Sequence, residues 1–157
     1  MKTFAFLAVL FMAMLAGCES SNGPSTDNSQ TGASAEANGV LFTLTIPETI
    51  FELEDTLTGV FKVINESGSE KVFHFPNLQQ HGFQLIDING RISIDFPLGF
   101  LPAESTLRLE PGERKEYSII SPFRNFDGEI IERGKYKMSA FLLEDYSPKV
   151  ILNIEVR

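Results

Sequence analysis

Residues 83–96 read Phe-Gln-Leu-Ile-Asp-Ile-Asn-Gly-Arg-Ile-Ser-Ile-Asp-Phe. Two short runs rich in Ile, Leu and Phe flank the pair Asn89-Gly90. Asn-Gly accepts the positive φ angles that both central residues of a type I′ turn require, and this turn is the favoured two-residue connection of a β-hairpin. The stretch therefore predicts an antiparallel hairpin with strands over residues 83–88 and 91–96.

The chain on either side of this hairpin repeats the same pattern from Gly39 onward. Short runs of Val, Ile, Phe, Leu and Thr are interrupted about every eight to twelve residues by Gly, Pro, Asn or Ser, as in antiparallel strands joined by turns. Glu110-Pro111-Gly112-Glu113 predicts a type II turn, because Pro suits its second position and Gly its third. Further strands are predicted over residues 41–46, 57–65, 71–75, 105–109, 115–120, 135–143 and 149–156. This spacing favours an all-β antiparallel sandwich.

The N-terminus has the three parts of a bacterial lipoprotein signal peptide over residues 1–17. Lys2 supplies a positive charge, residues 4–15 are apolar and uncharged, and Leu15-Ala16-Gly17-Cys18 resembles a lipobox. A permanent membrane helix is disfavoured, because residues 4–17 would span about 21 Å of a hydrocarbon core of about 30 Å. A plain secretory signal is the alternative. Cys18 is the only cysteine of the chain, and we expect it to carry the acyl chains.

An acylated Cys18 would hold the protein on a bacterial membrane, in the cell envelope, with its domain outside the cytoplasm. Residues 18–38 follow as a run of small and polar residues that lacks large apolar side chains, which predicts a flexible tether. The folded domain is then expected over residues 39–157. Because acylation consumes the only thiol, the domain has none left for a disulfide, a metal or nucleophilic catalysis.

The lengths of the predicted connections suggest how the domain is oriented. If every connection reverses the chain, the short turns at 66–70, 89–90, 111–113 and 144–148 gather at one end. The longer connections 47–56, 76–82, 97–104 and 121–134 gather at the other. The tether would join the first predicted strand at the short-turn end, so the long loops are expected to face away from the membrane.

These longer loops combine proline with large apolar residues, which suits rigid protein recognition because little conformational entropy is lost on docking. The alternative is that the same side chains plug the open end of the core. The candidate residues for binding a protein partner are Leu98, Phe100, Leu101, Phe123, Arg124 and Phe126.

Three motifs together resemble the BsuPI-type family of intracellular proteinase inhibitors. They are Phe83-x-Leu85-x-Asp87-x-Asn89-Gly90, Leu109-x-Pro111-Gly112-Glu113 and Gly134-x-Tyr136-x-x-x-Ala140. The resemblance covers roughly residues 40–143 and implies an immunoglobulin-like sandwich of about seven to nine strands, with a protease as the partner. Tyr136 stands where a sandwich of this kind places a tyrosine corner.

No pattern in the sequence indicates an enzyme, a cofactor or a metal. The two histidines, His74 and His81, have no obvious third ligand nearby, and neither a nucleophile elbow nor a phosphate-binding glycine loop is present. The net charge of −8 disfavours nucleic acid as a partner. Two functions stay open: a protein-binding module, with proteinase inhibition as its specific form, or a structural lipoprotein that packs into an envelope assembly.

Overall fold

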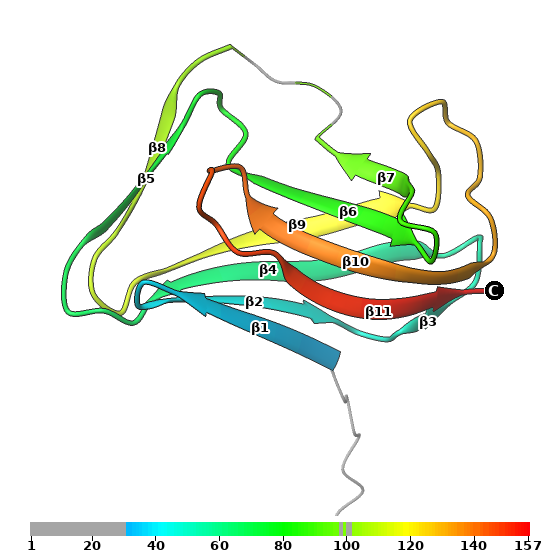
Figure 1. The fold of residues 1–157 in the computed structure, drawn as a ribbon, viewed down its shortest axis with the longest axis horizontal. Coiled ribbons are helices and arrows are strands. Elements are labelled where there is room, and N and C mark those ends of the chain that lie inside the picture. The colour runs from blue at the N-terminus through cyan, green and yellow to red at the C-terminus, as the bar shows by residue number, and fades with distance from the viewer. Residues whose placement is uncertain (1–30, 98, 100–101) are drawn as a thin grey trace, which may run out of the picture.

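The computed structural model describes residues 31–97, 99 and 102–157, and this part of the chain contains strands without helices (Figure 1). The strands are β1 (Thr31–Ala37), β2 (Val40–Ile46), β3 (Ile50–Phe51), β4 (Thr56–Asn65), β5 (Lys71–Phe75), β6 (His81–Asp87), β7 (Ile92–Phe96), β8 (Ser105–Leu109), β9 (Arg114–Pro122), β10 (Gly134–Leu142) and β11 (Val150–Val156). The predicted all-β fold is confirmed. Each of the nine predicted strands overlaps an observed one, and β1 and β3 are additional.

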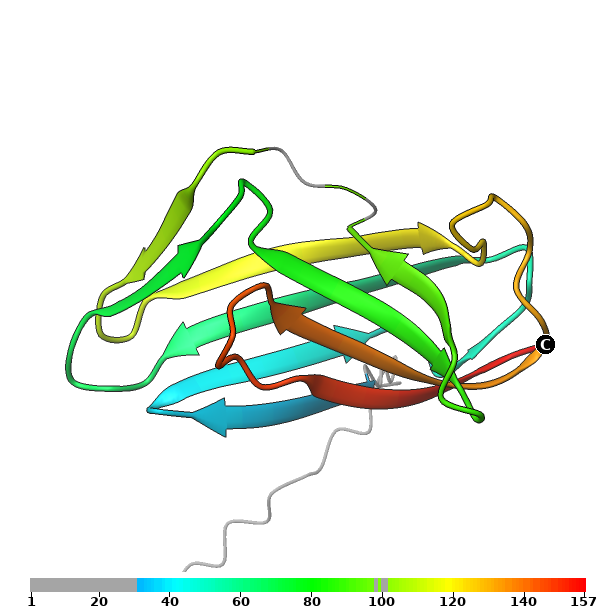
Figure 2. The same ribbon diagram turned by 45° about the horizontal axis from the view of Figure 1, so that its top comes forward.

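The strands form two large sheets and one small one. One large sheet has the order β1-β2-β4-β9 and the other β3-β11-β10-β6-β7, while β5 and β8 pair with each other alone. All pairings are antiparallel except that of β3 with β11. Figures 1 and 2 show the large sheets as two layers, with the β5-β8 arm projecting from one end. The predicted β-sandwich is therefore present.

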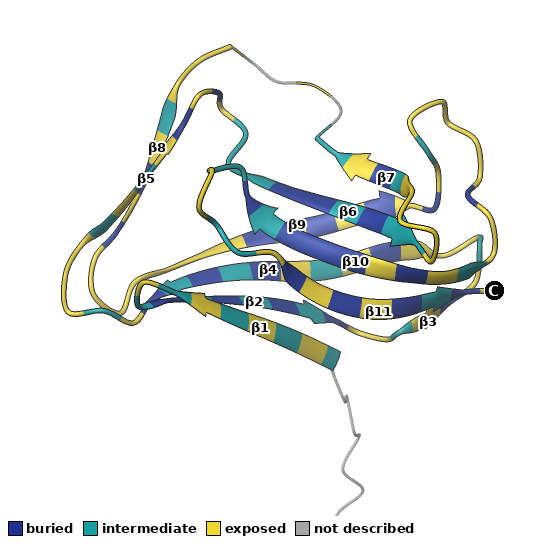
Figure 3. Cartoon of the chain, viewed as in Figure 1, coloured by how far each residue is buried: buried dark blue, intermediate teal, exposed yellow. Residues whose placement is uncertain are grey.

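Alternation along the strands builds the core between the two sheets. Every second residue of β2, from Val40 to Ile46, is buried, and β11 buries every second residue from Val150 to Val156 (Figure 3). Successive side chains of a strand point to opposite faces, so one face of each sheet is apolar and the other is wetter. Phe61 lies at the centre, with its ring 6.4 Å from that of Phe42 and 6.1 Å from that of Tyr117.

The type I′ turn lies at Asn38-Gly39, and its predicted location at Asn89-Gly90 is wrong. Asn38 and Gly39 have φ angles of 54° and 75° and join β1 to β2, whereas Gly90 alone has a positive φ in the later pair. Asp87 changes the later turn, because its carboxylate accepts the backbone N–H of Asn89 at 2.8 Å. The predicted type II turn is confirmed by the φ of 80° at Gly112.

Strand β1 lies inside the segment that the composition predicted to be a tether. Its residues pair with β2 from Thr31, opposite Ile46, to Ala37, opposite Val40. The prediction of a flexible segment up to residue 38 is thus wrong for residues 31–37. Composition failed because an edge strand is stabilised by backbone pairing and by small side chains such as Ala33 and Ala35, which are half-buried against the core. Cys18 and its preceding Leu15, Ala16 and Gly17 lie outside the described residues.

Because β1 precedes β2, the chain enters the described domain at the end opposite to the predicted one. Thr31 lies opposite Ile46, which begins the β2–β4 connection, and Thr56 at the end of that connection lies opposite Pro122. The described domain therefore begins at the end that carries connections 47–55 and 123–133. The prediction that the tether joins at the short-turn end is wrong, because it omitted one antiparallel reversal.

The predicted sorting of long and short connections fails as well. The short turn between β6 and β7 lies beside the long β9–β10 connection, as the 3.7 Å ion pair of Arg91 with Glu132 shows. Connection 76–80 leads from the arm to His81, which lies opposite Leu142 at the other end of β10 from Gly134 (Figure 1). The assumption behind the sorting, that each strand reverses within one of two sheets, does not hold for the β5-β8 arm.

The Asn38-Gly39 turn provides a test of how β1 is held. Replacing Gly39 with alanine is expected to lower the free energy of unfolding by about 1–2 kcal/mol, because its φ of 75° is unfavourable for residues with a Cβ and that Cβ would lie 2.9 Å from Cβ of Ser67. Hydrogen exchange of the Thr31–Ala37 amides should accelerate more than exchange in β10. Gly68→Ala, with no neighbouring atom within 4 Å, serves as the control, and an equal effect there would contradict this account.

Candidate protein-interaction site

At one end of the sandwich, the start of β7 and the β9–β10 connection carry exposed apolar side chains. Ile92 follows the β6–β7 turn and is 48% exposed, while Phe126 and Ile130, in the β9–β10 connection, are 72% and 55% exposed. Ile92 and Ile130 line the same hollow of about 290 Å³. We call Ile92, Phe126 and Ile130 the loop-end surface. Phe126 projects from the same connection as Ile130 but does not line this hollow. Exposed apolar groups that lie close together are typical of sites that bind another molecule.

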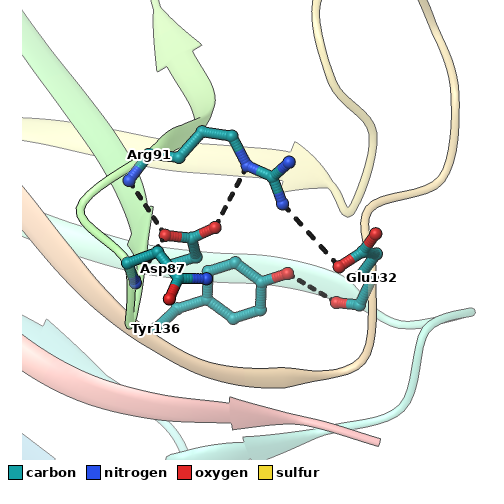
Figure 4. A network of polar contacts seen from close by, with 5 residues as sticks. Asp87, Arg91, Glu132 and Tyr136 are labelled. Carbon is teal, nitrogen blue, oxygen red and sulfur yellow. Dashed lines mark hydrogen bonds and ion pairs between the residues drawn. The ribbon is translucent and has the colours of Figure 1, made fainter.

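A polar network ties these two segments together (Figure 4). Nε of Arg91 lies 3.1 Å from Oδ2 of Asp87, and its Nη2 lies 3.7 Å from Oε2 of Glu132. The Tyr136 hydroxyl donates a hydrogen bond to the carbonyl of Glu132 at 2.5 Å. This bond agrees with the tyrosine corner expected from the sequence. The network thus connects the β6–β7 turn, the end of the β9–β10 connection and strand β10.

The protonation states of Asp87 and Tyr136 at neutral pH favour this polar network. The backbone N–H of Arg91 is the main cause that holds the pKa of the Asp87 carboxyl below its usual value, and the N–H of Asn89 and the Arg91 guanidinium act in the same direction. Burial raises the pKa of the Tyr136 phenol. At neutral pH, Asp87 is therefore charged and Tyr136 keeps the proton that it donates to Glu132.

Hydrogen bonds within the β9–β10 connection fix its tip. The Asn125 N–H donates to the Glu129 carbonyl at 2.8 Å, the Gly128 N–H donates to the Asn125 carbonyl at 3.0 Å, and the Asn125 side chain accepts the Glu129 N–H at 2.9 Å. The Arg124 guanidinium also donates to the Gly128 carbonyl at 2.8 Å. Phe126 therefore projects from a closed turn, and an ordered loop loses little conformational entropy on binding.

The six predicted contact residues have different outcomes in the structure. Phe123 is only 1% exposed and packs on Phe51 with 5.5 Å between ring centroids, so its prediction as a contact residue is wrong and the alternative of a core plug is confirmed for it. Phe123 continues the inward face of Tyr117, Ile119 and Ser121 on β9. Phe126 is exposed, and Arg124 is exposed but shapes the loop. Leu98, Phe100 and Leu101 lie outside the described residues.

Sequence reasoning did not single out Ile92 and Ile130. Ile92 offered no usable signal, because it stands two residues before Ile94, which is 6% exposed and faces the core, and residues two apart in a strand share one face. The register between β6 and β7 shifts at Leu85 and Ile86, opposite Ile94 and Ile92, and such an irregularity turns a side chain away from the regular alternation. Ile130 had no signal either, since its exposure depends on how the β9–β10 connection closes on itself.

The two histidines differ in their surroundings. The ring of His81 is half-buried and stacks on Tyr117 with 4.5 Å between centroids, whereas His74 is exposed on β5. Burial raises the pKa of Tyr117 to about 12, and its hydroxyl donates to Oε1 of Gln80 at 2.9 Å. Within residues 31–97, 99 and 102–157, no group of three or more His, Cys, Asp or Glu side chains is placed to hold a metal ion.

Burial of His81 predicts a pH dependence of stability. Desolvation lowers its pKa below the usual 6.5, so the unfolded chain takes up a proton at a higher pH than the folded protein does. The associated stability is present above about pH 6.5 and is lost as the pH falls through the folded-state pKa. Denaturation at pH 7.5 and 5 should show this loss in the parent protein and a smaller loss in His81→Gln. His74→Gln should behave as the parent, and an equal change in both variants would contradict the assignment.

Comparison with known proteins identifies no family. No protein-family model and no curated protein matches the chain. Among solved structures, a beta-glucosidase from Listeria innocua in complex with gluconolactone is 17% identical with a TM-score of 0.41, and the match covers 81% of this chain and 16% of that one. EmGH1, a beta-glucosidase from Erythrobacter marinus, is 16% identical with a TM-score of 0.46, over 82% of this chain and 16% of that one.

The C-terminal domain of wzt is 8% identical with a TM-score of 0.45, and the match covers 82% of this chain and 78% of that domain. This chain thus spans about a sixth of the length of the two beta-glucosidases. With TM-scores below 0.5, these likenesses carry no argument about function. In the described part of the chain, no helix is long and apolar enough to cross a membrane.

Proposed function

We propose that this chain is a non-catalytic bacterial lipoprotein, anchored through acyl chains on Cys18, whose β-sandwich binds a protein partner through the loop-end surface. The observation that carries the proposal is the exposure of Phe126 and Ile130 on a loop closed by its own hydrogen bonds. A few large side chains, aromatic ones among them, supply much of the binding energy in protein interfaces when they become buried against a partner.

The position of Thr31 favours a partner close to the membrane. Thr31 lies at the same end of the sandwich as connection 123–133, and twelve residues separate it from Cys18. A chain of that length reaches about 40 Å at full extension. A lipid on Cys18 would therefore keep the loop-end surface within reach of the bilayer surface, where other envelope proteins lie.

Proteinase inhibition is the specific form of this proposal, and it rests on the resemblance to BsuPI-type inhibitors. A panel of extracytoplasmic proteases incubated with the full chain would test it by residual activity. Inhibition that is lost in Phe126→Ser would support this form, and full protease activity at a large molar excess of the chain would remove it.

A structural role in an envelope assembly is the second candidate. Its supporting observation is the outer face of the β1-β2-β4-β9 sheet, where Val60 is 38% and Ile120 is 71% exposed. An assembly through this face would bury apolar groups that the described chain leaves in contact with water.

One experiment distinguishes the two surfaces. The full chain would be cross-linked in membranes of the source bacterium, as the parent, as Phe126→Ser/Ile130→Ser and as the matched pair Val60→Ser/Ile120→Ser. Loss of cross-linked partners in the first variant alone supports binding through the loop-end surface. Loss in the second variant alone supports the structural role. Identical partners in all three would overturn both.

A further inference from the structure

Among residues 31–97, 99 and 102–157, one edge of β5 in the β5-β8 arm has no strand partner. β5 and β8 pair over five residues each, from Lys71, opposite Leu109, to Phe75, opposite Ser105. Across the described residues, the backbone of β5 makes hydrogen bonds with β8 alone. Figure 1 shows the arm diverging from the two large sheets. The second edge of β5 therefore presents N–H and C=O groups that are free to pair with an added strand.

Two hollows lie beside β5. One of about 320 Å³ is lined by Lys71, Val72 and Phe73. Another of about 500 Å³ is lined by His74, Phe75 and Pro76 and extends over Ser105 and Thr106 of the paired strand β8. Glu144 and Tyr146 of the β10–β11 connection line both hollows, so the two belong to one groove. Six extended residues, from Lys71 to Pro76, are about 20 Å long, which is the length of a short extended peptide.

The lining of the groove is partly apolar and partly acidic. Phe73 and the nearly buried Phe42 line it beside the β1–β2 turn. Three acidic residues, which we call the acidic rim, also line it against one lysine, Lys71: Glu144 and Asp145 of the β10–β11 connection and Glu104 before β8. Tyr146, which lines both hollows, is 84% exposed. An occupant that complements this lining has basic side chains and intervening apolar ones.

Other occupants fit less well. A second copy of the chain, paired through β5, would bring two acidic rims together, which costs free energy. The usual protections of an edge strand are lysine, proline or a bulge. Here Lys71 and Pro76 stand at the two ends of the edge, and the stretch 72–75 between them has neither.

We propose that the groove between β5 and the β10–β11 connection binds an extended, basic segment of a partner protein, which adds as a strand to the open edge of β5. Main-chain hydrogen bonds to β5 supply affinity, and the acidic rim selects basic residues. This site is separate from the loop-end surface and does not depend on it.

The probe is a decapeptide that alternates Val and Lys, titrated into the full chain in detergent and followed by fluorescence anisotropy and by amide shifts of residues 72–75. We expect saturable binding that shifts these amides. An analogue with alternate backbone amides N-methylated should bind at least about tenfold more weakly, because its strand hydrogen bonds are blocked. A Val-Glu peptide should show no saturable binding.

The charge variant Glu144→Lys/Asp145→Lys should weaken binding at least about tenfold. Its matched control, Glu48→Lys/Glu54→Lys, makes the same charge change at exposed residues outside the groove and should change binding less than about twofold. Tyr146→Ala, at an exposed position, tests the same β10–β11 connection without a charge change and should also weaken binding. Circular dichroism identifies any variant that fails to fold.

Three results would overturn the proposal. The first is the absence of saturable binding of the Val-Lys peptide. The second is equal weakening by the two charge variants, which would indicate unspecific attraction to the whole acidic protein. The third is equal affinity for the N-methylated peptide, which would exclude strand addition.

Discussion

Replacement of Phe123 by alanine is expected to lower the free energy of unfolding by about 3–5 kcal/mol, the usual cost of removing a buried phenylalanine ring. Phe123 is 1% exposed, and its ring packs on that of Phe51. The cavity would open between the β9–β10 connection and β3, which is only two residues long. Urea denaturation followed by circular dichroism measures the change.

Phe126, three residues further along, provides the matched control. Its side chain is 72% exposed, and Phe126→Ala should change the free energy of unfolding by less than about 0.5 kcal/mol. The same pair of variants should have the opposite order in the cross-linking experiment, where Phe126 is expected to matter through contact. A comparable loss of stability in the two variants would show that the β9–β10 connection packs differently from this structure.

The second large effect is expected for Asn65→Ala, with a loss of about 3 kcal/mol. Asn65 is fully buried, and its side-chain amide donates to the carbonyls of Ser69 and Leu109, both at 2.8 Å. Its Oδ1 accepts the Ser67 N–H at 3.0 Å. Alanine would remove all three hydrogen bonds. The bond to the Leu109 carbonyl is buried, and a buried polar group left unsatisfied costs about 1–3 kcal/mol, whereas the Ser69 carbonyl still accepts the Ser67 hydroxyl.

Asn65→Asp tests the loss of the two N–H donors alone, because aspartate keeps the acceptor oxygen and the size of the side chain. It should also lower the free energy of unfolding, whereas Asn89→Ala at an exposed turn position should leave it nearly unchanged. A loss below about 1 kcal/mol in Asn65→Ala would mean that water or a rearranged loop replaces these hydrogen bonds.

Asn65 has a consequence for the groove as well. Its backbone N–H donates to Glu113 at 2.9 Å and its carbonyl accepts from Gly112 at 2.7 Å, while its side chain holds Ser69 before β5 and Leu109 at the end of β8. It thus attaches the base of the β5-β8 arm to β4. Asn65→Ala is expected to weaken binding of the Val-Lys peptide through loss of arm order.

Local patterns determined the strands of this protein and part of its turn chemistry. The hairpin around Asn89-Gly90 and the turn at Pro111-Gly112 were predictable, because alternation and proline or glycine preferences act within a few residues. The exact turn at Asn89 was not, since the Asp87 carboxylate accepts the N–H groups of Asn89 and Arg91 and stabilises a longer loop.

Tertiary structure alone decided which loop residues are available to a partner. Phe123 and Phe126 look alike in the sequence, but one is core and the other is exposed, because burial depends on Phe51, a residue distant in the chain. The strand character of residues 31–37 likewise depends on pairing with β2 and not on composition. The sequence by itself determined an all-β sandwich and the expectation of an anchor at Cys18. The packing of segments far apart in the chain decided where that sandwich begins, which end carries the loop-end surface and where β5 stays open.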